Sequence, residues 1–339
     1  MVKAIVVDRD YGSVSLLQQE ELRDMLAGKG IEISMIHCLS EDEIITACSE
    51  ADVIMGTGNP LITAKVIGAL PHLKMISRFG IGVNSIDLDA AAEKGIPVTF
   101  LPGFCAEELT AHATAMILGL MRNTAYYDRH IRAGEWPKGK YFVPQNIRNC
   151  TVGLMGFGAA ARPMAAVFGR GFGARIISFD PYVTQEAADK YGVHMVSFET
   201  LITESDIISI HVPLTKETKY VFNYDIFKKM KNTAMIINVS RGGIIHEGDL
   251  IRALKEGEIR YAGLDVFEYE PLDRQNPLIA MDNVILTPHS GFYGEAAKKN
   301  QISMTAEILD KAFNHNIIST RVVANKNVIA AKACKFYFN

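Results

Sequence analysis

The sequence has few of the features that mark a disulfide-bonded, metal-binding or membrane-embedded protein. Its five cysteines are scattered over 339 residues, with no CxxC pair and no cysteine–histidine spacing typical of metal ligands. This argues against a disulfide framework and against a bound metal. No apolar run approaches the ~20 residues that span a bilayer, and the run after Lys3 is too short and too charged for a signal peptide. These absences predict a protein of a reducing compartment, with the cytoplasm as the default location.

An excess of charge of one sign is also missing. The formal net charge is -3, and the chain is 48% hydrophobic and 22% charged, so there is no electrostatic reason to expect nucleic acid or a membrane surface as a partner. The length exceeds the size at which a single hydrophobic core usually stops growing, so we expect two domains. No polyanion partner is implied.

Short β-branched runs alternate with helical stretches through most of the chain. Residues 4–101 contain one such series and residues 151–289 a second, and each predicts a parallel sheet covered by helices. We therefore expect an α/β fold with two doubly wound parallel-sheet domains. A long helix predicted at 293–313 could carry the chain back across the first domain. The first domain would then comprise residues 1–102 and 292–339, and the second residues 103–291.

Two segments between and after these series are harder to interpret. A helix is expected at 107–122, and an irregular arm at 123–149, where several aromatic side chains and two prolines occur. The aromatic residues could belong to a core or to a dimer contact, and we expect a homodimer formed through residues 104–149. The end of the chain, 322–339, could be a docked extension or a frayed end.

Gly156-Phe-Gly158-Ala-Ala-Ala161 follows the predicted strand 151–155 and opens a helix. Gly156 allows a tight turn, Gly158 lets the backbone approach a pyrophosphate, and Ala161 is small enough for the helix to pack on the strand. The next strand ends in Asp180, close to the ~20-residue offset of the acid that hydrogen-bonds an adenosine ribose. Because Asp180 would repel a 2′-phosphate, the motif predicts NAD rather than NADP. The alternative is a glycine-rich turn without a ligand.

Arg241, Glu270 and His289 lie at or just beyond the ends of three predicted strands, residues 235–240, 261–267 and 284–289. Ligands of parallel sheets bind outside the carboxyl ends of the strands, so these three side chains could converge on one small molecule. Arg241 could hold the carboxylate of a 2-oxo acid and polarise its carbonyl. His289 could donate a proton to the carbonyl oxygen as hydride arrives, and a neighbouring Glu270 would favour the imidazolium. Taken singly, each could be an ordinary surface or strand-end residue.

A glycine-containing loop, Gly80-Ile81-Gly82, follows a strand expected at 73–77. Its backbone N–H groups could face a substrate carboxylate. A plain turn is equally consistent with these residues.

Together these stretches resemble the D-isomer-specific 2-hydroxyacid dehydrogenase family from about Ala4 to Phe313. The resemblance rests on Arg78-Phe-Gly-Ile-Gly-Val-Asn-Ser-Ile-Asp87, Leu101-Pro-Gly103, Gly153-Leu-Met-Gly-Phe-Gly158, Phe179-Asp-Pro181, His211-Val-Pro213, Ile237-Asn-Val-Ser-Arg-Gly-Gly243, Gly263-Leu-Asp-Val-Phe-Glu-Tyr-Glu-Pro271 and Thr287-Pro-His289. It implies a Rossmann NAD-binding domain inserted in a flavodoxin-like substrate-binding domain. It also implies that Arg241, Glu270 and His289 are catalytic.

The resemblance further implies which residues contact the cofactor. Ala159 and Ala160 would line the pyrophosphate, and Asp265 would hold the nicotinamide amide. The remaining residues expected to line the cofactor are Val212, Pro213, Thr218, Val239 and Ser240. The sequence departs from the family in having Ala159-Ala-Ala161 where Arg-Ile-Gly is common, Asn84 where Asp is usual, Ala111 where an acid precedes the helix histidine, and His246 where Asp is usual.

Two functions remain open at this stage. The first is an NAD-dependent reductase that makes D-2-hydroxy acids, and the second is an NAD-sensing scaffold like the C-terminal-binding-protein corepressors. Within the first, the absence of arginine from residues 56–60 favours an unphosphorylated substrate, and Phe292-Tyr293 resembles the aromatic pair of D-lactate dehydrogenases and of the C-terminal-binding-protein branch. Glyoxylate or hydroxypyruvate reduction and phosphoglycerate oxidation are the alternative activities.

Overall fold

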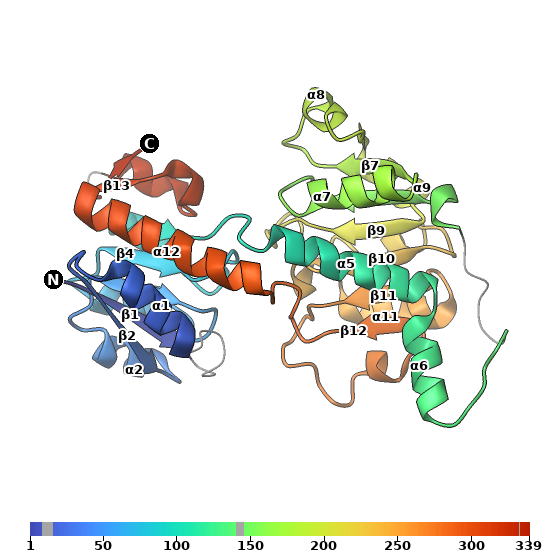
Figure 1. The fold of residues 1–339 in the computed structure, drawn as a ribbon, viewed down its shortest axis with the longest axis horizontal. Coiled ribbons are helices and arrows are strands. Elements are labelled where there is room, and N and C mark those ends of the chain that lie inside the picture. Colours follow the sequence, from blue (N-terminus) through green and yellow to red (C-terminus); the bar gives the residue numbers. More distant parts are fainter. Residues whose placement is uncertain (9–15, 140–145, 332) are drawn as a thin grey trace. The chain divides into compact units, whose positions relative to one another are not determined.

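The computed structural model describes residues 1–8, 16–139, 146–331 and 333–339, and the chain divides into two compact units (Figure 1). Unit 1 comprises Met1–Phe104 and Gly294–Asn339, and unit 2 comprises Cys105–Tyr293. The chain passes between units at 104/105 and 293/294, beside the boundaries expected at 102/103 and 291/292. No helix of the described residues is long and apolar enough to cross a bilayer.

Unit 1 contains a five-stranded parallel sheet with the strand order β2-β1-β3-β4-β5, which is the flavodoxin-like order. The strands are β1 (Val2–Asp8), β2 (Ile31–His37), β3 (Val53–Gly56), β4 (Met75–Arg78) and β5 (Val98–Thr99). The helices are α1 (Leu16–Leu26), α2 (Glu41–Ala47), α3 (Ala64–Ala69), α4 (Leu88–Glu93) and α12 (Glu295–His315). In Figure 1, α12 lies beside α1, which it contacts. The second segment of unit 1 therefore packs with the first.

The end of the chain is docked on the edge of this sheet. The side chain of Asn325 accepts a hydrogen bond from Val98 N (2.8 Å) and donates one to Ile96 O (2.9 Å). Just after β5, Phe100 N donates to Val322 O (2.9 Å). Two short strands, β13 (Ile317–Ile318) and β14 (Tyr337–Phe338), then pair with each other. Of the two interpretations left open by the sequence, the structure has the docked extension.

Unit 2 contains a seven-stranded parallel sheet with the order β12-β11-β10-β9-β6-β7-β8. This is the Rossmann order with one added strand, and the two sheets together confirm the predicted α/β fold class. The strands are β6 (Thr151–Met155), β7 (Arg175–Phe179), β8 (His194–Met195), β9 (Ile207–Ile210), β10 (Met235–Asn238), β11 (Tyr261–Leu264) and β12 (Val284–Leu286). The helices are α5 (Ala106–Met121), α6 (Thr124–Arg132), α7 (Ala161–Ala165), α8 (Gln185–Asp189), α9 (Phe198–Glu204), α10 (Tyr224–Phe227) and α11 (Glu247–Glu256).

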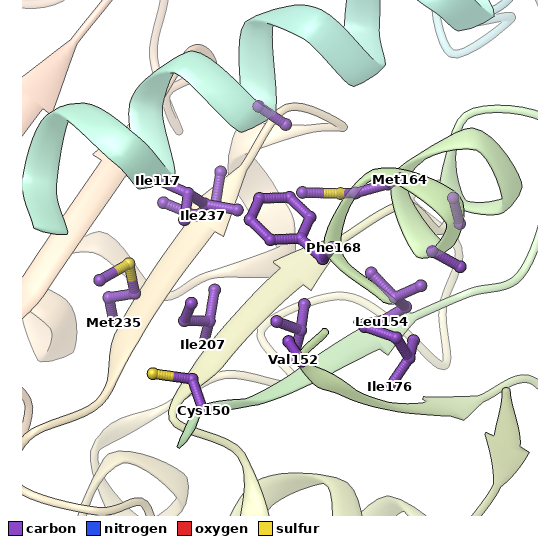
Figure 2. Packing of buried hydrophobic residues seen from close by; sticks show 14 of the residues in the cluster. Ile117, Cys150, Val152, Leu154, Met164, Phe168, Ile176, Ile207, Met235 and Ile237 are labelled. Atoms are coloured by element: carbon purple, nitrogen blue, oxygen red, sulfur yellow. The ribbon is translucent and has the colours of Figure 1, made fainter. Parts of the chain in front are cut away.

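Buried apolar side chains lie on both faces of this sheet. On β10, Met235 and Ile237 point into one core cluster and Ile236, between them, points into the other, because successive side chains of a strand alternate between faces. Figure 2 shows the first cluster, in which Ile117 of α5 lies next to Ile237, and Phe168 projects toward them from the π-helical segment Ala166–Gly171 that continues α7. Helix layers on both faces explain why the strands read as continuous apolar runs.

The arm after α5 is more regular than predicted. It begins with α6 and ends with a 3₁₀ turn at Ile147–Asn149. Asn123, in the left-handed conformation (φ 53°), separates α6 from α5, and its side chain accepts a hydrogen bond from the hydroxyl of Tyr261 (2.9 Å). No residue of α6 is buried, yet its nine residues are amphipathic, a helical pattern that the prediction of an irregular arm overlooked. Tyr141 and Phe142 of the predicted arm lie outside the described residues.

The last three strands end earlier than predicted. β10, β11 and β12 stop at Asn238, Leu264 and Leu286, not at residues 240, 267 and 289. After β10 the side chain of Asn238 bonds to the backbone of Ser240 and Arg241 (3.1 and 2.9 Å), and such local bonds compete with continued strand pairing. The three catalytic candidates therefore lie on loops beyond the strand ends.

Gly153 in β6 has no room for a side chain. A methyl group there would lie 2.1 Å from Ser205 Oγ and 2.9 Å from a methyl of Leu201, and the Ser205 hydroxyl is bound to Leu201 O (2.6 Å). We expect Gly153→Ala to lower the free energy of unfolding of unit 2 by about 1–3 kcal/mol, measured by urea denaturation. Gly171→Ala is the control, because nothing lies within 4 Å of its Cβ position, and it should change stability by less than about 0.5 kcal/mol. Equal stability of the two variants would contradict this packing.

Candidate active site

Three neighbouring strands of unit 2 end side by side at the carboxyl end of the sheet. In the register of β10, β11 and β12, Asn238 is opposite Leu264, and Leu264 is opposite Leu286. The backbone pairing continues one residue further, since Asp265 N donates to Asn238 O and Thr287 N donates to Leu264 O (both 3.0 Å). The loops that carry the three catalytic candidates therefore start from adjacent points.

His289 and Glu270 meet directly. His289 Nδ1 lies 2.7 Å from Glu270 Oε2, and the two side chains are 42% and 36% exposed. Glu270 Oε1 also accepts a hydrogen bond from Phe267 N (3.0 Å). Burial raises the pKa of Glu270, but the hydrogen bond and charge of His289, the Phe267 N–H and the charge of Arg241 outweigh it, so the pKa is lowered overall. With Nδ1 held by an ionised carboxylate, Nε2 is the nitrogen that can exchange a proton with a substrate.

Arg241 begins the 3₁₀ turn Gly242–Ile244, and its Nη1 donates to Ser240 O (2.6 Å). Burial lowers the pKa of Arg241, and the charge of Glu270 and the Cys105 thiol oppose that effect; a guanidinium nevertheless stays protonated at any working pH. At Gly242, a Cβ would lie 1.8 Å from Phe267 O. Only glycine therefore allows the Arg241 loop to pass directly against the loop that leads to Glu270.

The turn that presents His289 is held by Asp265. His289 itself is in the left-handed conformation (φ 54°), and its N–H donates to Asp265 O (2.7 Å). The Asp265 carboxylate accepts hydrogen bonds from Ser290 N and Gly291 N (both 2.9 Å) and from Thr287 Oγ1 (2.6 Å). Burial raises the pKa of Asp265, but hydrogen bonds from His112, Thr287 and the two backbone N–H groups outweigh it and lower the pKa to about 2. Contact of Asp265 with a nicotinamide stays a prediction.

The glycine-rich loop after β6 has the form that a dinucleotide requires. Gly156 has a φ of 90°, and a Cβ there would lie 2.8 Å from a methyl of Val212 and 2.9 Å from His211 O. In contrast, nothing lies within 4 Å of a Cβ at Gly158, so the loop is open there. Asp180 links this loop to the end of β7, because its carboxylate accepts from Phe157 N and Tyr182 N (both 2.9 Å). The carboxylate oxygens of Asp180 have further lone pairs, which can accept hydrogen bonds from the two hydroxyls of a ribose.

The other predicted cofactor residues also lie beyond the carboxyl ends of the strands. Ala159 is exposed and Ala160 half-buried before α7, which begins at Ala161. Within the loop after β9, Thr218 Oγ1 donates to Pro213 O (2.7 Å). That loop is joined to the end of β10, where Val239 is buried and the hydroxyl of Ser240 donates to Val212 O. The structure thus brings these residues together, and their contacts with a cofactor stay predictions.

The predicted substrate loop belongs to unit 1. Gly80 N donates to Arg78 O (2.8 Å), and Leu101 N donates to Gly80 O (2.9 Å). The guanidinium of Arg78 donates to Gly82 O (2.7 Å) and to Gly56 O (3.0 Å), so it braces the loop from inside. Ile81 is 38% exposed at its tip. The geometry is a braced turn, and a role of Gly80, Ile81 and Gly82 in substrate binding stays a prediction.

Sequence reasoning missed three residues that shape the site. Asn238, Thr287 and His112 contact the catalytic loops through side-chain hydrogen bonds. A signal existed for Asn238, since an asparagine at a strand end commonly bonds to the backbone two residues later. None existed for His112, whose partner lies far along the chain.

A protein-family model and the most similar known sequences point to the same family. Residues 114–291 match the family model described as the NAD binding domain of D-isomer specific 2-hydroxyacid dehydrogenase. The chain is 35% identical over 288 residues to D-3-phosphoglycerate dehydrogenase of Archaeoglobus fulgidus, covering 85% of this chain and 54% of that protein. It is 34% identical over 299 residues to hydroxypyruvate reductase of Thermotoga maritima, covering 88% and 95%.

A solved structure shares the fold over nearly the whole chain. The crystal structure of D-lactate dehydrogenase from Aquifex aeolicus, complexed with NAD and lactic acid, has a TM-score of 0.80, 26% identity and coverage of 92% of this chain and 95% of that one. By contrast, the chain spans about half the length of the phosphoglycerate dehydrogenases that it matches.

The low pKa of Asp265 predicts how stability depends on pH. A pKa of about 2 lies below that of an unfolded aspartate, so the stabilisation is complete above about pH 4 and is lost as the pH falls toward 2. At about 1.4 kcal/mol per pKa unit, a shift of nearly two units amounts to about 2–3 kcal/mol. Asp265→Asn should lose at least about this much stability at pH 7 and should lack this part of the acid dependence. Urea denaturation between pH 7 and pH 2.5 measures both effects. The exposed substitution Asp225→Asn should keep the wild-type dependence, and an Asp265→Asn protein that does the same would contradict the assignment.

Proposed function

The chain belongs to the D-isomer-specific 2-hydroxyacid dehydrogenase family, and from this premise we propose that it interconverts a 2-oxo acid and a D-2-hydroxy acid with NAD as cofactor. The observation that carries the proposal is the 2.7 Å contact between His289 and Glu270 on loops that start beside the loop of Arg241. An imidazole backed by a carboxylate, next to a fixed cation, has the groups needed to bind an anionic 2-oxo acid and to protonate its carbonyl oxygen.

In this proposal Arg241 binds the substrate. Its planar guanidinium pairs with the carboxylate by two parallel hydrogen bonds and polarises the adjacent carbonyl. Since burial removes water from around Arg241, its charge acts through a less polar medium than bulk solvent, which strengthens the interaction with a substrate anion.

His289 supplies the proton. Nδ1 is held by Glu270, so Nε2–H donates to the carbonyl oxygen during reduction, and neutral Nε2 accepts the hydroxyl proton during oxidation. Glu270 stays ionised through the range in which an imidazole titrates, because its pKa is lowered. NADH, when bound, supplies the hydride that reduces the carbonyl carbon. Asp180 would hold the adenosine ribose and disfavour the 2′-phosphate of NADPH.

The substrate that we favour is an unphosphorylated 2-oxo acid. Residues 56–60, Gly-Thr-Gly-Asn-Pro, contain no cation for a phosphate. The guanidinium of Arg78, which contacts this loop, donates to the backbone carbonyls of Gly56 and Gly82. The similarity to phosphoglycerate dehydrogenases supports the alternative of a phosphorylated substrate. An NAD-sensing scaffold would bind the cofactor without turnover.

We also propose a homodimer formed through residues 104–149. α6 has no buried residue, and Ile131 and Trp136 are 48% and 76% exposed, so a second copy would cover apolar surface. All five cysteines are free thiols, which supports a reducing, cytoplasmic location.

Turnover distinguishes the candidate functions. Initial rates of NADH and NADPH oxidation would be measured with pyruvate, hydroxypyruvate, glyoxylate, branched and aromatic 2-oxo acids, and 3-phosphohydroxypyruvate. We expect NADH to be preferred and an unphosphorylated acid to be reduced fastest. Preference for the phosphorylated acid would favour the phosphoglycerate branch, and NADH binding without any turnover would favour the scaffold.

Arg241→Lys should lower kcat/KM for the preferred 2-oxo acid by at least about a hundredfold, because an ammonium cannot reproduce the two-point geometry of a guanidinium. NADH affinity, measured by fluorescence titration, should be unchanged. Arg252→Lys is the control, since the exposed side chain of Arg252 on α11 pairs with Glu256. Wild-type kinetics for Arg241→Lys would show that this residue does not bind the substrate.

The rate of reduction should fall with rising pH, and the rate of oxidation should rise, because the two directions need opposite protonation states of one imidazole. Glu270→Gln removes the negative charge beside the imidazole, so both profiles should move to lower pH. Initial rates of both reactions between pH 5 and pH 10 would measure the displacement. Unmoved profiles would mean that the contact between Glu270 and His289 does not operate during catalysis.

A further inference from the structure

A chain of hydrogen bonds connects helix α5 to the turn that carries His289. His112 on α5 places Nε2 2.9 Å from Thr287 Oγ1 and 3.3 Å from Asp265 Oδ1. Thr287 Oγ1 lies 2.6 Å from Asp265 Oδ1. The Asp265 side chain is 2% exposed and that of His112 is 22% exposed, so the chain lies largely out of solvent.

The direction of these hydrogen bonds follows from their chemistry. An ionised carboxylate only accepts, so Thr287 donates its single hydroxyl hydrogen to Asp265. Toward His112 the threonine oxygen must therefore accept, which requires a hydrogen on His112 Nε2. The order is His112 Nε2–H to Thr287 Oγ1, and Thr287 Oγ1–H to Asp265 Oδ1.

At its Asp265 end, this series of hydrogen bonds fixes the backbone around His289. The two oxygens of Asp265 accept hydrogen bonds from Ser290 N and Gly291 N, and its carbonyl accepts one from His289 N. His289 has the left-handed φ of 54°, which residues with a Cβ seldom adopt and which surrounding bonds must therefore maintain. A Cβ on Gly291 would lie 2.9 Å from Asp265 Oδ2 and 3.4 Å from His112 Cδ2, so the turn packs directly against these hydrogen-bonded side chains.

We propose that His112 and Thr287 are positioning residues that hold the His289 turn through Asp265, so that the imidazole of His289 keeps its contact with Glu270. Neither residue needs to touch substrate for this role. The inference rests on the proposed function, because it assigns His289 the proton transfer. A purely structural role, in which the same bonds only join α5 to the sheet, is the alternative that the experiment must separate.

Matched substitutions separate the two roles. Thr287→Val keeps the shape of the side chain and removes the hydroxyl, whereas Thr287→Ser keeps it; His112→Phe removes the donor, whereas His112→Gln retains an N–H₂ at the end of the side chain. Thr203→Val is the control for loss of a hydroxyl, since exposed Thr203 donates only along its own helix, to Glu199 O (3.0 Å). The preferred 2-oxo acid and NADH are the probes.

Thr287→Val and His112→Phe should lower kcat by about tenfold to a hundredfold, with KM and NADH affinity within about twofold of wild type. Thr287→Ser, His112→Gln and Thr203→Val should stay near wild type. In Thr287→Val the fall of reduction with pH should begin at lower pH, as in Glu270→Gln, and the double variant should lose less activity than the product of the two single losses.

An activity-independent signal completes the test. The ring proton resonances of His289, assigned by their absence in His289→Ala, should shift in Thr287→Val and not in Thr287→Ser. Wild-type kcat and resonances in Thr287→Val, equal losses in Thr287→Ser, or losses that multiply with Glu270→Gln would overturn the positioning role. If the wild-type protein reduced no 2-oxo acid, the proposed function would fail. The resonances alone would then decide whether the hydrogen bonds from His112 to Asp265 orient His289.

Discussion

Parallel pairing of β10, β11 and β12 is the constraint on which the candidate site depends. Neighbouring strands lie about 4.8 Å apart, and here their carboxyl ends are in register, with pairing that continues to Asp265 and Thr287. A guanidinium, a carboxylate and an imidazole that are far apart in the sequence are therefore delivered by loops with neighbouring starting points. The chemistry proposed for the protein requires only that these loops then turn toward each other.

Small residues and buried polar groups make those turns possible. Gly242 lets one loop pass against the carbonyl of Phe267, and Gly291 lets another pack on Asp265. Asn238 and Asp265 are both buried, and both are hydrogen-bonded to the backbone of the loops. These two side chains therefore hold the loops rigidly, and their polar atoms have hydrogen-bond partners. The His289–Glu270 pair, at 42% and 36% exposure, is instead open to an incoming molecule. Rigid support below an accessible pair suits proton transfer to a substrate.

The sequence predicted the two parallel sheets and the strand ends of the site, but it placed those ends too late. Val239, Val266 and Phe267 are buried although they lie beyond the strands. Apolar residues report burial, whereas a strand is defined by backbone pairing, so an apolar run can outlast its strand. Helix α6 was missed for another reason: its residues are amphipathic, but it is short, and the aromatic residues and prolines of 123–149 pointed to an irregular arm.

By itself, then, the sequence determined the alternation of strands and helices, the glycine-rich loop before Asp180, and the presence of Arg241, Glu270 and His289 after successive strands, because each depends on residues close together in the chain. The tertiary structure alone decided that His289 bonds Glu270 through Nδ1 and that His112 reaches Thr287 and Asp265. Such partners come from different elements, and their distances and directions are set by how α5 and the strand-end loops pack. No local pattern of residues encodes that geometry.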